Sequence, residues 1–235
     1  MAVKTLRIDG RDVAARPEDT ILEVAREHGI PIPTLCALEG ISTAGACRLC
    51  LVEIKGRRGL MPACTTRVEE GMEVVTASAQ LLADRRAIVE LLFAERNHVC
   101  AVCVANGRCE LQGLAQSFGL THVEIPYRFP ALPVDASHAR FGIDHNRCVL
   151  CTRCVRVCDE VEGAHTWDVM GRSVDARITS DLDDAWGASD TCTSCGKCVQ
   201  VCPTGALFEK GRAVAEIVRK RQFLVYLADM RERQR

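Results

Sequence analysis

The 235-residue sequence is poor in aromatic residues, carries almost no net charge and has no long hydrophobic run. Phe, Trp and Tyr make up only 4% of the chain, which argues against large aromatic cores and base-stacking platforms. The formal net charge of -1 gives no electrostatic reason to expect nucleic acid as a partner. No apolar stretch reaches the roughly 18 residues of a membrane-spanning helix, and residues 1–10 carry no secretory or twin-arginine signal. We therefore expect a cytoplasmic protein without membrane insertion.

Motifs for nucleotides and flavins are missing as well. There is no Gly-x-Gly-x-x-Gly after a predicted strand and no phosphate-binding loop. No cysteine follows Cys202, and the tail after it is too short for a catalytic metal domain. We therefore expect no active site on this chain, with the substrate chemistry on other chains.

Cysteine is abundant: the 15 cysteines fall into four groups along the chain. Four clusters with four ligands each need 16 donors, which the cysteines and one histidine, His98, supply without a remainder. This count predicts an iron-sulfur electron carrier. The groups are Cys36, Cys47, Cys50 and Cys64; Cys100, Cys103 and Cys109; Cys148, Cys151, Cys154 and Cys158; and Cys192, Cys195, Cys198 and Cys202.

Disulfide bonds and zinc sites are the two alternative roles for the cysteines. An odd number of cysteines at tight Cys-x2-Cys spacings fits a disulfide framework poorly, and a reducing compartment would keep the thiols available for metal. A zinc-binding interaction scaffold is the other alternative, in particular a four-cysteine zinc site in the first group. A zinc protein would be colourless, whereas iron-sulfur centres absorb visible light.

Residues 1–78 predict a small α+β domain. A hairpin turns at Asp9-Gly10, a helix lies between Pro17 and Gly29, and further strands are expected at 51–54 and 72–76. This order resembles the β-grasp [2Fe-2S] ferredoxin domain, and the resemblance implies a [2Fe-2S] cluster on the first cysteine group. The ten residues between the first two cysteines are similar to the gap in the complex I large iron-sulfur subunit and in iron-only hydrogenases.

Residues 79–118 predict a long helix over 79–96, followed by a three-cysteine motif. The helix has an apolar stripe that includes Leu82 and Leu91, with Arg85 outside it. The motif resembles a [4Fe-4S] site with one histidine and three cysteines in the same families, which implies a small helical domain with the ligands His98, Cys100, Cys103 and Cys109.

The position of the histidine departs from that family pattern. The pattern has three residues between histidine and cysteine, but only Val99 separates His98 from Cys100. In an extended segment, residues two apart project to the same face, so the two side chains would still converge. The alternative is that His98 caps the preceding helix and that His122, His138 or His145 is the fourth donor.

Residues 119–138 predict a connecting segment, and 139–210 contain two copies of a Cys-x2-Cys-x2-Cys-x3-Cys run. The runs resemble the bacterial 2×[4Fe-4S] ferredoxin, in which the fourth cysteine of each run serves the other cluster. The resemblance implies one [4Fe-4S] cluster on Cys148, Cys151, Cys154 and Cys202, and another on Cys158, Cys192, Cys195 and Cys198. We expect a hairpin between the runs, with Trp167 and Trp186 serving in packing.

Residues 211–235 predict a C-terminal helix that either covers the ferredoxin module or docks a partner. The full order resembles the small iron-sulfur subunit of the diaphorase module in cytoplasmic NAD-reducing nickel-iron hydrogenases, and the chain end at Arg235 favours that subunit over longer relatives. The resemblance implies single-electron relay between a subunit that binds FMN and NAD and the small and large nickel-iron hydrogenase subunits. The alternatives are relay subunits of an NAD-dependent formate dehydrogenase, an NADP-reducing hydrogenase or a complex I-like assembly. Because the radius of gyration expected for this length is about 18 Å, we expect the four clusters to be neighbours.

Overall fold

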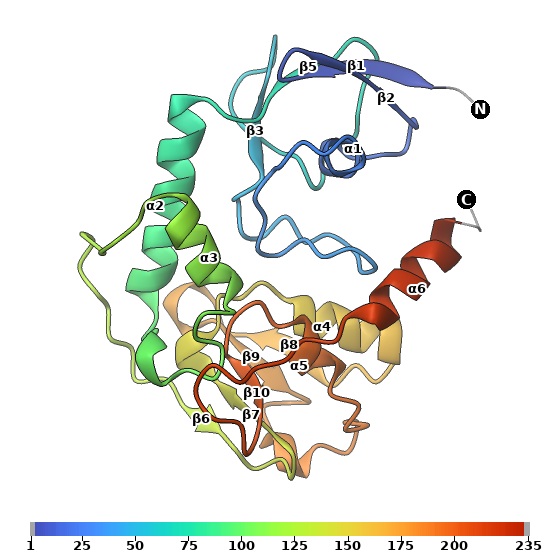
Figure 1. Cartoon of the computed structure of the whole chain (residues 1–235). Coiled ribbons are helices and arrows are strands. Elements are labelled where there is room, and N and C mark those ends of the chain that lie inside the picture. The colour runs from blue at the N-terminus through green and yellow to red at the C-terminus, as the bar shows by residue number, and fades with distance from the viewer. Residues whose placement is uncertain (1–2, 233–235) are drawn as a thin grey trace. The chain divides into compact units, whose positions relative to one another are not determined.

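The computed structural model describes residues 3–232, which divide into two compact units (Figure 1). The first unit comprises the residues up to Ala37 together with Thr43–Ile88. The second comprises Leu38–Ser42 and the residues from Val89 onward. Within residues 3–232, no helix has the length and hydrophobicity needed to cross a membrane.

The first unit is built on a five-stranded sheet. Its hairpin turns through Asp9 and Gly10, whose φ angles of 48° and 78° are both left-handed, as a two-residue turn of this kind requires. The predicted hairpin is confirmed, and β1 pairs on its other side with β5 in parallel. The sheet order is β2-β1-β5-β3-β4, formed by β1 (Lys4–Ile8), β2 (Arg11–Ala15), β3 (Leu51–Ile54), β4 (Met61–Pro62) and β5 (Glu73–Val75).

Helix α1 (Ile21–Glu27) contributes to the buried core of this unit. It begins later than Pro17, because Thr20 and Glu23 form a reciprocal capping box at its start. Its buried residues Ile21, Leu22, Val24 and Ala25 belong to one cluster with the inward-facing residues of the strands. The result is an apolar core of helix on sheet.

Helix α2 (Ala79–Glu95) confirms the long helix expected from the sequence, but its buried face differs from the predicted stripe. Leu82 and Leu91 are exposed, at 48% and 53%, whereas Arg85 is only 3% exposed. Arg85 donates from Nε to the Leu49 carbonyl at 3.0 Å and from an Nη to the Leu51 carbonyl at 2.9 Å. The apolar pattern did not predict that Arg85 is buried, because its burial depends on hydrogen bonds from the guanidinium group to these two carbonyls.

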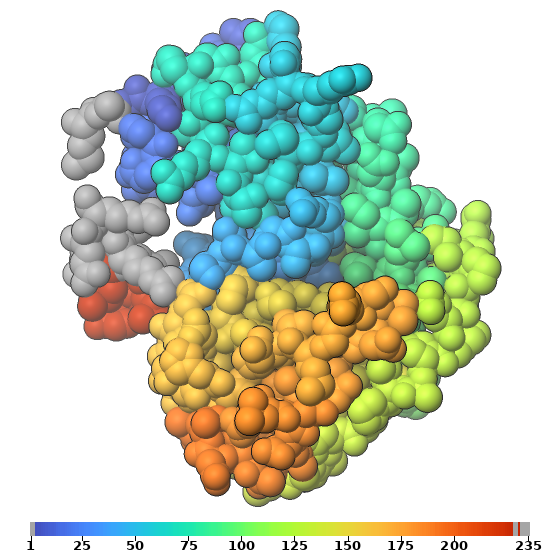
Figure 2. All heavy atoms as spheres, turned by 180° about the vertical axis from the view of Figure 1, so that it is seen from behind, coloured from blue at the N-terminus to red at the C-terminus, as the bar shows by residue number. Residues whose placement is uncertain are grey.

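The second unit consists of short elements. A three-stranded sheet has the order β10-β7-β6, and β8 pairs with β9 as the hairpin expected between the cysteine runs. In Figure 2, the segment from the first run through this hairpin forms a continuous surface, coloured yellow to orange. The elements are α3 (Glu110–Ser117), β6 (Val134–Asp135), β7 (Phe141–Asp144), α4 (Arg153–Val157), β8 (Trp167–Met170), β9 (Arg177–Ser180), α5 (Lys197–Val201) and β10 (Leu207–Glu209).

The C-terminal helix α6 (Gln222–Glu232) is shorter than the predicted helix over 211–235. Residues 211–221 are not helical, because their backbone and side chains bond to other segments of the unit. Ala215 N donates to the Cys103 carbonyl and Ile217 N to the Val104 carbonyl, at 3.2 and 2.9 Å. The end of the predicted helix, residues 233–235, lies outside the described residues.

Candidate iron-sulfur sites

The first cysteine group gathers in the first unit, on the loops between α1, β3 and β5. Cys36, Cys50 and Cys64 are buried, and Cys47 is partly buried. Cys47 N lies 3.5 Å from Cys36 Sγ, and Leu35 N lies 3.4 Å from Cys47 Sγ. These amides approach the sulfurs in the way that supports a metal-bound thiolate.

The four thiols of this group also interact with one another. Side-chain hydrogen bonds from Cys47 and Cys64 lower the pKa of Cys36 to about 2. Side-chain hydrogen bonds with Cys36 and Cys50 raise the pKa of Cys64. Every member of the group is therefore linked to another thiol, and the loops bring all four sulfurs to one place.

Arg85 braces the loop that carries two of these cysteines. The carbonyls that it binds, those of Leu49 and Leu51, flank Cys50 on either side. Arg48, between Cys47 and Leu49, has a left-handed φ of 57°. No signal in the sequence placed Arg85 here, because a charged residue on a helix is usually solvent-exposed.

The second cysteine group lines a cavity in the second unit together with His98. His98 Nε2 is buried and has no hydrogen-bond partner among the described residues. This buried nitrogen is available as a metal ligand, the role that a neutral imidazole commonly has in proteins. The lining residues are Phe93, His98, Val99, Cys100, Cys103, Cys109, Leu111, Gln112, Arg147, Thr204 and Gly205.

The local backbone differs from the extended segment assumed for His98 and Cys100. Cys100–Val102 forms a turn of 3-10 helix, so an alternating strand geometry does not explain how these side chains meet. Instead, His98 follows the end of α2 and packs edge-on against Phe93, with the ring centroids 5.3 Å apart. Burial lowers the pKa of His98 to about 4, which favours the neutral imidazole.

The other histidines lie elsewhere. His138 uses both ring nitrogens, with Nε2 at 3.0 Å from Ser194 Oγ and Nδ1 accepting from two backbone amides. His122 is exposed beside Glu124. His145 lines a different cavity, next to Arg177. None of the three lines the cavity of the second cysteine group.

The last two groups are sorted into two cavities, with one cysteine of each run exchanged. One cavity contains Cys148, Cys151, Cys154 and Cys202, and the other contains Cys158, Cys192, Cys195 and Cys198. Helices α4 and α5 explain the exchange, because each separates the third and fourth cysteines of its run by about one helical turn. The structure thus brings together the same two sets that the ferredoxin resemblance implied.

Both runs have the same left-handed backbone conformation at two positions among their first three cysteines. Leu150 and Thr152 have left-handed φ angles of 50° and 56°, and Ser194 and Gly196 at the equivalent positions have 56° and 73°. Left-handed residues in such loops turn successive N–H groups toward one side, which creates an anion-binding concavity. Three of the four are not glycine, so the sequence did not predict this geometry.

Burial makes these thiols reluctant to ionise. It raises the pKa of Cys148 to about 11 and that of Cys151 to about 12. Burial also raises the pKa of Cys109, to about 11. A thiolate at these positions therefore needs a positive partner, which is what iron would provide.

Each of the three cavities of the second unit is lined by four of the predicted donors. Four donors at each site fit three clusters of one kind. In the part of the chain that the structure describes, no three His, Cys, Asp or Glu side chains converge closely enough to hold a single metal ion. The thiols of the second unit surround spaces instead.

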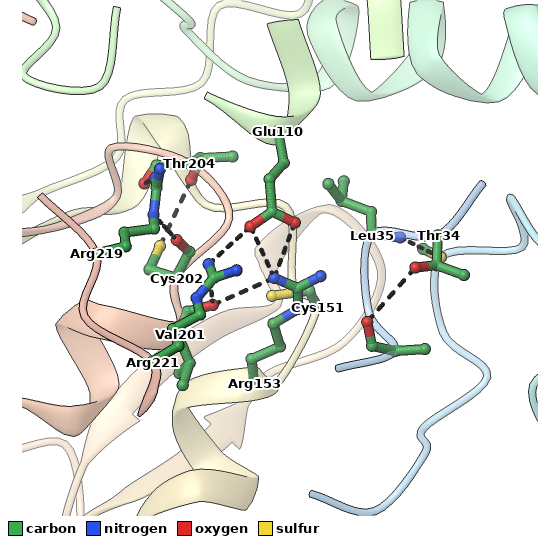
Figure 3. A network of polar contacts seen from close by, with 12 residues as sticks. Thr34, Leu35, Glu110, Cys151, Arg153, Val201, Cys202, Thr204, Arg219 and Arg221 are labelled. Carbon is green, nitrogen blue, oxygen red and sulfur yellow. Dashed lines mark hydrogen bonds and ion pairs between the residues drawn. The ribbon is translucent and has the colours of Figure 1, made fainter. Parts of the chain in front are cut away.

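A polar network links the segment after Cys109 to the ferredoxin-like runs. Figure 3 shows the Glu110 carboxylate between the guanidinium groups of Arg153 and Arg221, at 2.9 and 2.7 Å. Arg219 donates from Nε to the Cys202 carbonyl at 2.7 Å. This network anchors residues 219–221 and accounts for their departure from the predicted helix.

The short segment after Cys202 contributes to two cavities. Thr204 lines both the cavity of His98 and the cavity that contains Cys202. A Cβ atom on the next residue, Gly205, would lie 2.4 Å from Cys103 Sγ, so only glycine fits there without displacement. The sequence does not predict this contact between Gly205 and Cys103, because the two residues are far apart along the chain.

Three family models cover most of the chain. Residues 3–79 match a 2Fe-2S iron-sulfur cluster binding domain, and residues 85–124 match the NADH-ubiquinone oxidoreductase-G iron-sulfur binding region. Residues 141–208 match the ferredoxin-like domain of NADH-quinone oxidoreductase subunit 3. The expected α+β fold of [2Fe-2S] and [4Fe-4S] ferredoxin-like domains is thereby confirmed.

Curated relatives differ in how much of their length the chain spans. The NADP-reducing hydrogenase subunit HndD of Solidesulfovibrio fructosivorans is 39% identical over 89% of this chain, which covers 36% of that protein. The NADPH-Fe(3+) oxidoreductase subunit alpha of Geobacter sulfurreducens is also 39% identical, over 88% of this chain and 24% of that protein. The chain thus spans about a third or less of these relatives.

Two other matches extend over nearly the whole of both chains. The NAD-reducing hydrogenase HoxS subunit gamma of Cupriavidus necator is 33% identical over 93% of this chain and 92% of that protein. A chain in the crystal structure of NAD+-reducing [NiFe]-hydrogenase in the H2-reduced state is 34% identical, with 94% of each chain covered and a TM-score of 0.86. The chain belongs to the family of iron-sulfur subunits that includes the gamma subunit of NAD-reducing hydrogenase.

Proposed function

We propose that this chain relays single electrons through one [2Fe-2S] and three [4Fe-4S] clusters in an oxidoreductase complex. The observation that carries the proposal is the sorting of donors in the second unit into three cavities with four donors each. Iron-sulfur clusters, when bound, supply one-electron oxidation and reduction. No bond-making step is assigned to this chain.

The chain's own residues have defined roles in this proposal. Sulfur ligands for the [2Fe-2S] cluster come from Cys36, Cys47, Cys50 and Cys64. The first [4Fe-4S] cluster uses His98, Cys100, Cys103 and Cys109, the second uses Cys148, Cys151, Cys154 and Cys202, and the third uses Cys158, Cys192, Cys195 and Cys198. Backbone amides, such as those near Cys36 and Cys47, orient the sulfurs and stabilise their negative charge.

The proposed partners are a flavin subunit that binds FMN and NAD, and the small and large subunits of a nickel-iron hydrogenase. This part of the proposal rests on the relatives that match over nearly their whole length, whose names describe NAD-reducing hydrogenases. In that setting the overall reaction is H2 + NAD+ = H+ + NADH, with hydride chemistry and hydrogen chemistry on the partner subunits. The chain's contribution is electron transfer between them.

Anaerobic purification with iron and acid-labile sulfide analysis tests the cluster content. We expect about 14 iron atoms per chain and a brown colour that bleaches on reduction. A colourless protein with zinc in place of iron and sulfide would refute the proposal and favour an interaction scaffold.

Co-purification of the native complex tests the partners. Nickel and FMN in stoichiometric amounts with this chain are the expected result. Molybdenum or tungsten in place of nickel would reassign the chain to a formate dehydrogenase while leaving its role in electron relay intact.

A further inference from the structure

The cavity with Cys158, Cys192 and Cys198 also contains the two tryptophans of the chain. Trp186 Nε1 lies 3.2 Å from Cys192 Sγ, within hydrogen-bond distance for sulfur. An indole N–H can only donate, so the sulfur is the acceptor. One thiol of this cavity therefore receives an indole N–H, and Trp167 lines the same cavity.

The two indoles are held rigidly. Trp186 is 1% exposed and Trp167 is 4% exposed, and the rings pack edge to face with centroids 4.7 Å apart. The Trp186 amide donates to the Asp135 carboxylate at 2.7 Å. Trp167 begins β8, where it pairs with Ser180 of β9. The direction of the Trp186 N–H is thus fixed by the fold before any cluster is bound.

The neighbouring cavity of the same module serves as an internal comparison. The described residues that line it include no tryptophan, and its side-chain partner for sulfur is the hydroxyl of Thr204, 3.7 Å from Cys202 Sγ. The two cysteine runs share their spacing and their left-handed loop residues. The indole donor is therefore a feature of one site and not of the repeated motif.

We propose that Trp186 is a positioning residue that raises the reduction potential of the cluster held by Cys158, Cys192, Cys195 and Cys198. Reduction adds negative charge to the cluster and its sulfurs, and an N–H donor stabilises the charged form more than the less charged one. This inference rests on the proposed function, because it requires a cluster in that cavity.

The test is an EPR-monitored redox titration of the full chain in its complex, comparing the wild type with Trp186→Phe. The variant retains an aromatic ring but loses the N–H. We expect one of the three [4Fe-4S] signals to become harder to reduce by about tenfold in its equilibrium constant, or about 59 mV for one electron. The other two signals should keep their potentials.

Two controls separate the hydrogen bond from packing. Phe141→Leu alters an apolar residue that lines the same cavity and stacks on Trp186, so its effect on the potential measures the contribution of packing alone. Benzothienylalanine at position 186 keeps the shape of tryptophan without the N–H, and it should reproduce the shift even if the phenylalanine variant loses its cluster.

The outcomes distinguish the two levels of the proposal. Wild-type iron near 14 per chain with unchanged potentials in both variants of Trp186 would overturn the role of the indole and leave the relay function standing, where ~14 is the iron content of one two-iron and three four-iron centres. An equal shift in Phe141→Leu would also overturn it, since packing would then be the cause. A wild-type protein without iron at this site would refute the proposed function itself.

Discussion

The two units of this chain use cysteine in different relations to their cores. In the first unit, the strands and α1 supply most of the buried cluster, and Cys50 and Cys64 are its only members from the four cysteines of this unit. In the second, Cys154, Cys158, Cys198 and Cys202 are buried members of the main hydrophobic cluster, and Cys148 and Cys192 pack against it. We therefore expect the core of the second unit to depend more strongly on its proposed clusters than the core of the first.

The largest expected effect is on the second unit when iron is removed. Metal binding that organises a core contributes directly to folding free energy, so chelation under reducing conditions should unfold the segments around α4 and α5. The strands β1 and β5 should keep their protection. Hydrogen exchange with mass spectrometry on the full chain measures both, and simultaneous loss of protection in both units would break the comparison.

The complementary change is a substitution that destabilises the first unit. Ile8 is fully buried in β1, and Ile8→Ala should cost about 2–5 kcal/mol of the stability of this unit through lost burial and a cavity. Thermal unfolding and EPR together give the readout: the [2Fe-2S] signal should be lost at a lower temperature than in the wild type. Unchanged [4Fe-4S] signals are the control, and their loss at the same temperature would contradict independent cores.

A substitution at Gly205 tests how tightly the second unit packs around the thiol of Cys103. Gly205→Ala would place a methyl group on Cys103 Sγ, and such overpacking typically costs about 1–3 kcal/mol. We expect about four fewer iron atoms per chain by metal analysis. Gly113→Ala is the matched control, since a Cβ there meets nothing within 4 Å. Full iron content in the Gly205 variant would show that the site accommodates the added methyl group without losing its cluster.

The smallest expected effect concerns the capping box of α1. Thr20→Ala removes a side chain that accepts from Glu23 N and should cost about 1 kcal/mol. Chemical denaturation followed at the first unit measures this loss. The potentials of the [4Fe-4S] clusters should not change, and a shift in any of them would reveal coupling that separate cores do not predict.

Much of the fold followed from local signals. Asp9-Gly10 predicted its hairpin because the turn needs left-handed residues, and the periodicity before Asn97 predicted α2. Even the exchange of Cys158 and Cys202 was expected, although from family resemblance and not from spacing alone. Its physical basis, two short helices that each reach from one cavity to the other, became visible only in the structure.

The remaining features depend on contacts between distant residues. Arg85 was assigned to the surface because a charge usually avoids burial, and nothing nearby in the sequence pointed to the Leu49 and Leu51 carbonyls. The segment before α6 had helical periodicity, but Arg219 and Arg221 bind carbonyls of the second cysteine run instead. Tertiary hydrogen bonds outweighed local preference at each of these positions.

Helices α4 and α5 have a further consequence for damage and repair. Each carries one sulfur donor for one cavity and, about a turn later, one for the other. An oxidant that destroys the occupant of either cavity would release an end of both helices at once. The two sites should therefore be assembled, and lost, as a pair.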